Sequence, residues 1–257
     1  MNRVPPGNIW LDNYRVSAVL VRRHAFLAVL TLLLIAGASG WVLYSWYVAS
    51  IYYGPAAVWN WTRLPLLTTA LLIPVFFYFL VRWNNLSRIL VRTHSRGLLI
   101  IRGRKQVKIP WNAVAELYTE AKRYGFSSLV WKHRNRIRLV TGHSGKQIKI
   151  PGDLENLDHL VHEIKSRIYP ELGSAIDQRL FSGQTVSFGP IQISSQSLQT
   201  ERTSLNWENL KSVELENGTL KITFTTPKRI REIRIQTARI PNLDLCYQLI
   251  RRMSGIS

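Results

Sequence analysis

The residues best suited to binding chemistry form a basic and aromatic stretch from Lys122 to Arg138, which reads KRYGFSSLVWKHRNRIR. Basic side chains can hold lipid phosphates while aromatic rings enter the membrane interface. The same mixture suits single-stranded nucleic acid, whose bases stack on rings. A pair of strands with rings inward and charges outward would give this pattern without any ligand. The candidate anion-binding residues are Lys122, Arg123, Trp131, Lys132, Arg134, Arg136 and Arg138.

Catalytic chemistry has little support in the sequence. The chain contains no P-loop, no G-x-S-x-G motif and no dinucleotide-binding fingerprint. His159 and His162 are spaced to share one helix face, but no third metal ligand accompanies them, so a solvated face is the favoured interpretation. The single cysteine, Cys246, excludes an internal disulfide and falls in an apolar helical pattern typical of a buried thiol. We therefore predict a protein that is not an enzyme and holds no cofactor and no metal.

Positive charge is distributed unevenly along the 257 residues, whose net charge is +19. Between Arg82 and Ile150 there are 16 Lys and Arg residues against 2 Asp and Glu, whereas Glu171 to Ser257 holds 11 against 8. A basic stretch beside a membrane attracts anionic lipid headgroups. Nucleic acid would be attracted by the same charge, but it is the disfavoured partner.

Two apolar runs precede this basic region. Residues 24–47 and 62–82 are each long enough to cross the hydrocarbon core as a helix. Pro65 fits a first helical turn, and Pro74 is expected to kink the second helix. An uncharged linker, residues 48–61, joins the runs. The pattern predicts a transmembrane hairpin within residues 23–85.

Arginine residues set the expected orientation of this hairpin. Cations flank its two outer ends, whereas Arg63 alone lies near the connecting linker. By the positive-inside rule, both termini are predicted to be cytoplasmic, including an N-terminal tail of residues 1–22. The flanking cations are Arg15, Arg22, Arg23, Arg82, Arg88 and Arg92.

The remaining chain contains an internal repeat, predicted as domains of residues 86–170 and 171–257. Each half has short alternating strands, a Trp before a later strand (Trp111 and Trp207) and a closing amphipathic helix. The helix starts align residue for residue, as NLDHLVHEI from Asn156 and NLDLCYQLI from Asn242. Asp153 is expected to cap the first of these helices. The predicted fold class is a helical membrane hairpin joined to a β-rich, α+β region.

The segment RGLLIIRGRKQVKIPWNAVAELY resembles bacterial pleckstrin-homology (PH) like domains that follow transmembrane helices. The segments GQTVSFGPIQIS, LNWENLKSVELENGTLKI and IPNLDLCYQLI are similar to an uncharacterised bacterial membrane-protein family of unknown function. That family has a transmembrane hairpin followed by two PH-like units. The resemblance implies two tandem half-open barrels, each closed by a C-terminal helix, in the bacterial cytoplasmic membrane. It implies no activity.

These observations favour a membrane-anchored interaction or scaffold protein that presents tandem PH-like domains at the cytoplasmic membrane face. Its expected partners are the lipid bilayer, anionic headgroups and a protein that the sequence does not identify. The alternative is an accessory subunit of a larger membrane transport or enzyme complex. For such a subunit, Ala36 and Gly40 would offer a small pair for close helix packing. Residues from about Ser87 onward are expected to fold without the hairpin.

Overall fold

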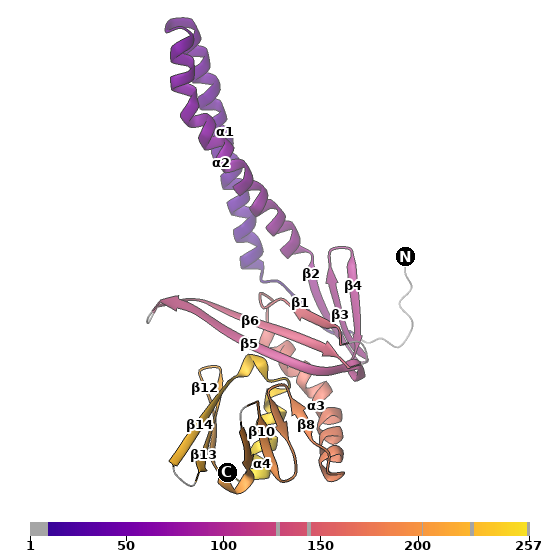
Figure 1. The fold of residues 1–257 in the computed structure, drawn as a ribbon. Coiled ribbons are helices and arrows are strands. Elements are labelled where there is room, and N and C mark those ends of the chain that lie inside the picture. The colour runs from indigo at the N-terminus through magenta and orange to yellow at the C-terminus, as the bar shows by residue number, and fades with distance from the viewer. Residues whose placement is uncertain (1–9, 127–128, 143–144, 202, 227–228, 256–257) are drawn as a thin grey trace. The chain divides into compact units, whose positions relative to one another are not determined.

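The computed structural model describes residues 10–126, 129–142, 145–201, 203–226 and 229–255. They form two compact units: one comprises residues 10–93 with 99–107, and the other comprises residues 94–98 with those from 108 onward. The chain is of the α+β class, with two long apolar helices, antiparallel sheets and a C-terminal helix (Figure 1). This agrees with the class predicted from the sequence.

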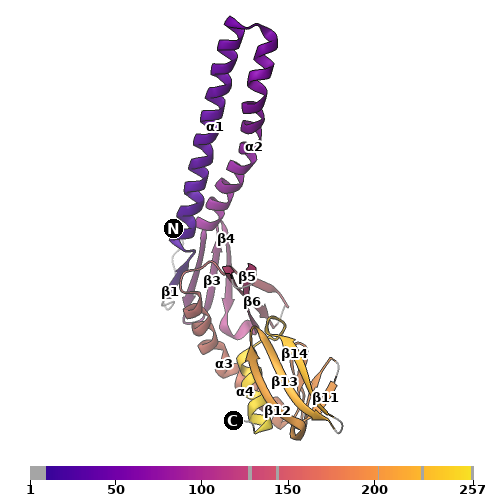
Figure 2. The ribbon, with the colours of Figure 1, turned by 90° about the vertical axis from the view of Figure 1, so that its left-hand side faces the viewer.

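The hairpin consists of helix α1, Ala18–Tyr52, and helix α2, Pro55–Ser87 (Figure 2). Both helices are long and apolar enough to cross a membrane. The runs predicted at residues 24–47 and 62–82 lie inside them. Sequence analysis therefore found both helices but underestimated their length.

The predicted linker, residues 48–61, is mostly helical, because the turn between the helices is very short. Gly54 has φ of +80°, a conformation that glycine adopts without steric cost. Pro55 then takes the first helical position, where its missing N–H and fixed φ are favourable. The helix start that we expected at Pro65 was wrong, because Pro65 and Pro74 both lie inside α2.

The face of α1 that packs on α2 carries small residues. Ala28 and Ala49 occupy one position of a seven-residue pattern, and Thr31 and Ser45 occupy another; all four are buried. Small side chains allow the two helix backbones to approach closely. Ala36 and Gly40 are exposed, so the small pair noticed in the sequence lies off this seam.

Strands from both sides of the hairpin form one four-stranded sheet, in the order β1-β2-β3-β4. The backbone N–H of Asp12 donates to the Thr93 hydroxyl oxygen at 3.2 Å. Sequence analysis assigned the first strand to an N-terminal tail and did not predict it. The strands are β1 (Trp10–Arg15), β2 (Ile89–His94), β3 (Gly97–Arg102) and β4 (Lys105–Pro110).

A second sheet has the order β5-β6-β7 and is followed by helix α3, Leu157–Phe181. The expected cap at Asp153 was wrong, because α3 begins after Asn156, which has the left-handed φ of 54°. Helix α3 also continues through Pro170, where sequence analysis placed a domain boundary. The elements are the 3-10 turn η1 (Trp111–Ala113), β5 (Val114–Phe126), β6 (Leu129–Thr141) and β7 (Gln147–Ile150).

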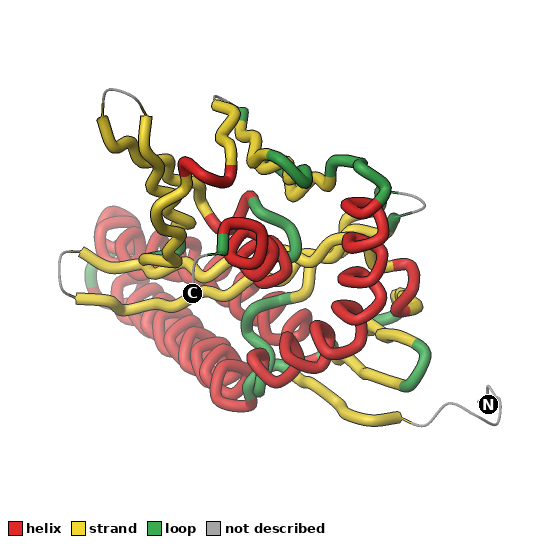
Figure 3. The backbone as a smooth tube through the Cα atoms, turned by 90° about the horizontal axis from the view of Figure 1, so that it is seen from below, coloured by secondary structure: helices red, strands yellow, loops and turns green. Residues whose placement is uncertain are grey.

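The rest of the chain repeats this order of elements around one buried apolar core. Helix α4, Leu243–Ser254, is the last helix before the C-terminus (Figure 3) and contributes Cys246, Leu249 and Ile250 to the core. The strands form sheets of order β8-β9-β10-β11 and β12-β13-β14. The remaining elements are β8 (Val186–Phe188), β9 (Ile191–Ile193), β10 (Ser197–Thr200), β11 (Thr203–Asn206), η2 (Trp207–Asn209), β12 (Leu210–Glu216), β13 (Thr219–Thr226), β14 (Arg229–Gln236) and η3 (Thr237–Arg239).

We call β1–β7 with α3 the first copy, and β8–β14 with α4 the second copy. The two copies share sheet order and a 3-10 turn that begins with Trp. The Trp111 indole N–H donates to the His94 carbonyl oxygen at 3.1 Å, and the Trp207 indole N–H donates to the Ser194 carbonyl oxygen at 3.2 Å. The predicted repeat is therefore present in the structure.

The copies differ most at the connection between their first two strands. In the second copy Gly189 and Pro190 join β8 directly to β9, where Phe188 pairs with Ile191. In the first copy residues 16–88 occupy the same place, between β1 and β2. The helical hairpin is therefore an insertion within the first copy rather than a segment that precedes it.

Candidate functional site

The basic and aromatic stretch forms the outer part of the β5–β6 hairpin. Its register pairs Lys122 with Arg134, Arg123 with His133 and Tyr124 with Lys132. The backbone of Trp131 and Arg136 belongs to β6. The side chains of residues 120–136 lie outside the described part of the structure, and six of the seven candidates fall in that range.

Arg138 is the candidate whose side chain is described, and it is engaged within the chain. Its guanidinium carbon lies 4.0 Å from the centre of the Tyr118 ring, which β5 holds opposite it. The Tyr118 hydroxyl in turn donates to a Glu116 carboxylate oxygen at 3.0 Å. Burial and this hydrogen bond raise the pKa of Tyr118 to about 12, so the phenol stays neutral at physiological pH. Arg138, at the base of the β5–β6 hairpin, therefore already has a partner within the chain.

Length distinguishes this hairpin from its equivalent in the second copy. Strands β5 and β6 have 13 residues each, whereas β12 and β13 have 7 and 8. The basic extension therefore belongs to the first copy alone.

The other residues that the sequence offered as candidates for chemistry are described by their exposure and hydrogen bonds. His159 and His162 are exposed on α3. Cys246 is fully buried, and burial raises the pKa of its thiol, which disfavours the reactive thiolate. Trp111 is buried and Trp207 is half-buried, and both donate to backbone carbonyls as described above.

A pocket of about 730 Å³ lies at the base of the helical hairpin, within the unit formed by residues 10–93 and 99–107. Sequence analysis missed it, because its cationic residues come from four separate segments. The signal was present in composition, since Asp12 is the only acidic residue in the first 115. The cationic lining residues are Arg15, Arg22, Arg88 and Arg104.

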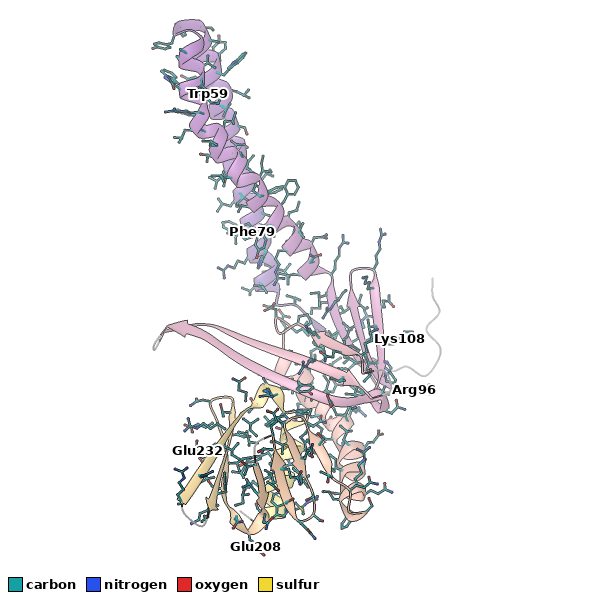
Figure 4. All side chains as sticks on the ribbon, in the orientation of Figure 1. Trp59, Phe79, Arg96, Lys108, Glu208 and Glu232 are labelled. Carbon is teal, nitrogen blue, oxygen red and sulfur yellow. The ribbon has the colours of Figure 1, made fainter. Side chains whose placement is uncertain are left out.

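The second copy shows the contrasting arrangement, in which surface cations face carboxylates. Glu232, which Figure 4 labels, pairs with Arg234 and with Lys221, and the hydrogen bond from Arg234 lowers the pKa of that carboxyl. Arg239 lies 2.7 Å from Glu201, and Arg252 pairs with Asp177.

These features define a class of protein: an α+β chain in which two helices able to cross a membrane are inserted into the first of two similar β-rich copies. Residues 14–255 match a Family of unknown function (DUF6585), and the chain belongs to this family. The match begins inside β1 and ends after α4, so it covers both copies and the hairpin. No curated protein matches the chain.

Proposed function

We propose that this chain is a two-pass membrane protein that presents two tandem PH-like units at the cytoplasmic face, where they bind lipid or a protein partner. The observation that carries the proposal is the insertion of the helical hairpin between β1 and β2. The helical hairpin is joined to the first copy at two points, because α1 follows β1 and α2 precedes β2, and these two strands are neighbours in one sheet. A single flexible linker would leave the domain free to leave the membrane surface.

The element order supports the PH-like assignment. Four strands, three strands and a closing helix recur in both copies, as expected for a half-open barrel with a C-terminal helix. Such domains act mainly by binding rather than by catalysis. The lack of the catalytic motifs sought in the sequence is consistent with a PH-like fold. Fold alone does not define a ligand, so the binding partner must come from the sites themselves.

The orientation can be tested by labelling introduced cysteines with a membrane-impermeant maleimide. Tyr53→Cys places a thiol at the tip of the helical hairpin, where the native side chain is 63% exposed. Ser174→Cys places one on the exposed face of α3. We expect Tyr53→Cys to react in intact cells, and Ser174→Cys to react only after the cells are permeabilised.

The wild-type chain is the matched control, because its single thiol, Cys246, is buried and should stay unlabelled in both conditions. Labelling of Ser174→Cys in intact cells would contradict the orientation. Equal labelling of both variants before permeabilisation would contradict a hairpin that crosses the membrane.

The alternative function, an accessory subunit of a larger membrane complex, is favoured by one observation. A side chain added at Gly37 or Gly40 would meet no atom within 4 Å, so this surface of α1 is not used by α2. If the hairpin is only an anchor, replacing both glycines with Leu should leave the protein folded and inserted in the membrane. Loss of a co-purifying membrane partner in that variant would support the accessory-subunit function instead.

A further inference from the structure

The pocket at the base of the helical hairpin combines cations with an apolar wall. Its arginines come from the end of β1, the first turns of α1, the residue between α2 and β2, and the β3–β4 turn. Its volume, about 730 Å³, falls within the range of small-molecule sites. Apolar lining residues include Val16, Val21, Leu86 and Ile89.

Among the residues that the structure describes, no carboxylate lines this pocket. In residues 10–115, all of which the structure places, Asp12 is the only acidic residue, and it does not line the pocket. Four guanidinium groups around one concave surface repel one another, and a bound anion would relieve that repulsion. The paired cations of the second copy show that exposed arginines elsewhere in this chain do meet carboxylates.

Backbone contacts hold two of the arginines in place. The Gly103 N–H donates to the Arg88 carbonyl oxygen at 3.1 Å, which ties the β3–β4 turn to the start of β2. Arg104 follows Gly103 in that turn, so the backbones of Arg88 and Arg104 are held near each other, and both residues line the pocket. Helix α1 begins at Ala18, another lining residue, and the positive end of its dipole adds to the field.

The distance along the helices places this pocket at the level of lipid headgroups, given the membrane orientation proposed above. Arg22 and Trp41 are 19 residues apart in α1, or roughly 28 Å at 1.5 Å per residue, which is close to the thickness of a hydrocarbon core. Arg63 and Arg82, which flank the longer uncharged run of α2, are also 19 residues apart. The tip, marked by Trp59 in Figure 4, is the opposite end of the hairpin from the pocket.

We propose that this pocket binds the phosphate-bearing headgroup of an anionic phospholipid from the adjacent leaflet. The guanidinium fork of arginine matches phosphate oxygens in a bidentate way. The half-buried Val21 and Ile89 would contact the glycerol and upper acyl region, while the buried Val16 and Leu86 support them from behind. This site is distinct from the β5–β6 stretch, and it deepens the proposed function by naming a lipid class for the first copy.

The test is native mass spectrometry of the delipidated full chain in detergent, titrated with phosphatidylglycerol or phosphatidylcholine. The pocket variant is Arg22→Gln with Arg104→Gln. The matched control is Arg23→Gln with Arg102→Gln, which removes the same charge from neighbouring positions that do not line the pocket. All four side chains are exposed, so both variants should keep the wild-type circular dichroism spectrum and melting temperature.

We expect the wild type to prefer phosphatidylglycerol, the pocket variant to bind the first such lipid about tenfold or more weakly, and the control to change about twofold or less. Equal loss in both variants, or no preference between the lipids in the wild type, would overturn the proposal. Full displacement by millimolar inorganic phosphate would show a free-phosphate site and would also overturn it. Because binding in detergent does not depend on orientation, a failure here is distinguishable from a failure of the labelling experiment.

Discussion

The two copies follow one plan, yet only the first contains the helical hairpin. In the second copy β8 passes to β9 through Gly189 and Pro190, and an added side chain at Gly189 would lie 2.6 Å from the Arg239 carbonyl oxygen. In the first copy the equivalent connection is the segment 16–88. A connection between neighbouring strands can therefore vary from a tight turn to a long helical hairpin while the strand order is kept.

The strand order also explains how the two helices can lie close together where they leave the sheet. Neighbouring strands lie about 5 Å apart, and packed helices lie about 8–10 Å apart. Helices that leave two adjacent strands can thus pack against each other within a short distance. The small side chains of the α1 seam fit this geometry, because they bring the helix axes close together.

The most severe test of this comparison is to give the first copy the connection of the second. We expect replacement of residues 16–88 by Gly-Pro to yield a soluble chain that unfolds cooperatively. A fragment that starts at Arg88 should instead lose about 3 kcal/mol or more, because it lacks β1 and the buried Tyr14, which is 4% exposed. Urea denaturation followed by circular dichroism compares the two proteins.

This outcome would revise the sequence-based expectation that residues from about Ser87 onward fold alone. Equal stability of the fragment and the Gly-Pro chimera would show that β1 contributes nothing to the stability of the first copy. The β1–β2 connection would then not be equivalent to the β8–β9 connection.

Sequence analysis predicted the helices, the repeat and most strands, because these depend on local periodicity. It missed β1 for a physical reason: the pairing partner of that strand, β2, lies beyond the hairpin. The strand itself is short and carries the polar residues Asp12 and Asn13, so nothing local distinguishes it from a tail. The sequence shows Asn156 and Asn242 only as aligned positions of a repeated motif. Their left-handed backbone conformation became visible in the structure.

The candidate sites show the same limit. The basic stretch of β5–β6 is continuous in sequence and could be found by reading along the chain. The arginine pocket brings together Arg15, Arg22, Arg88 and Arg104, whose proximity depends on the fold. Composition showed the lack of acidic residues there, but it could not show that the cations surround one concave surface.

The next largest effect should come from the aligned asparagines. The Asn242 amide oxygen accepts from the Leu117 N–H at 3.0 Å, and its amide nitrogen donates to the Ala115 carbonyl oxygen at 3.0 Å. Asn156 is exposed. We expect Asn242→Ala to cost about 3–5 kcal/mol, since it leaves a buried N–H unpaired and strains a left-handed residue. Asn156→Ala should cost about 1–2 kcal/mol, from the strain alone.

Chemical denaturation of the Gly-Pro chimera, or of the full chain in detergent, measures this difference. Asn242→Gly separates the two causes, because glycine accepts the left-handed conformation but makes no side-chain hydrogen bonds. Equal costs for Asn242→Ala and Asn156→Ala would show that docking of α4 on β5 does not stabilise the protein.

A smaller effect is expected at the tight turn of the second copy. Gly189→Ala should cost about 2–3 kcal/mol, because it combines a positive φ of 63° with a clash against the Arg239 carbonyl. Gly183 is the matched control, since its φ is +73° but an added side chain meets nothing within 4 Å. Its substitution by Ala should cost about 1 kcal/mol less, as measured by thermal denaturation. A neutral Gly189→Ala would mean that close approach does not constrain this turn.

The smallest effect is expected at the tryptophans that open the two 3-10 turns, and it tests whether the copies are energetically alike. Trp111→Phe and Trp207→Phe each keep an aromatic ring but remove the indole N–H that binds a backbone carbonyl. Each should cost about 1 kcal/mol, the usual net value of one hydrogen bond. The Trp111→Phe substitution should cost slightly more, because Trp111 is 8% exposed and its partner carbonyl is harder for water to reach. The double variant should show additive costs, since the two sites share no partner. A cost above about 2 kcal/mol at one site only would show that the repeated Trp has different roles in the two copies.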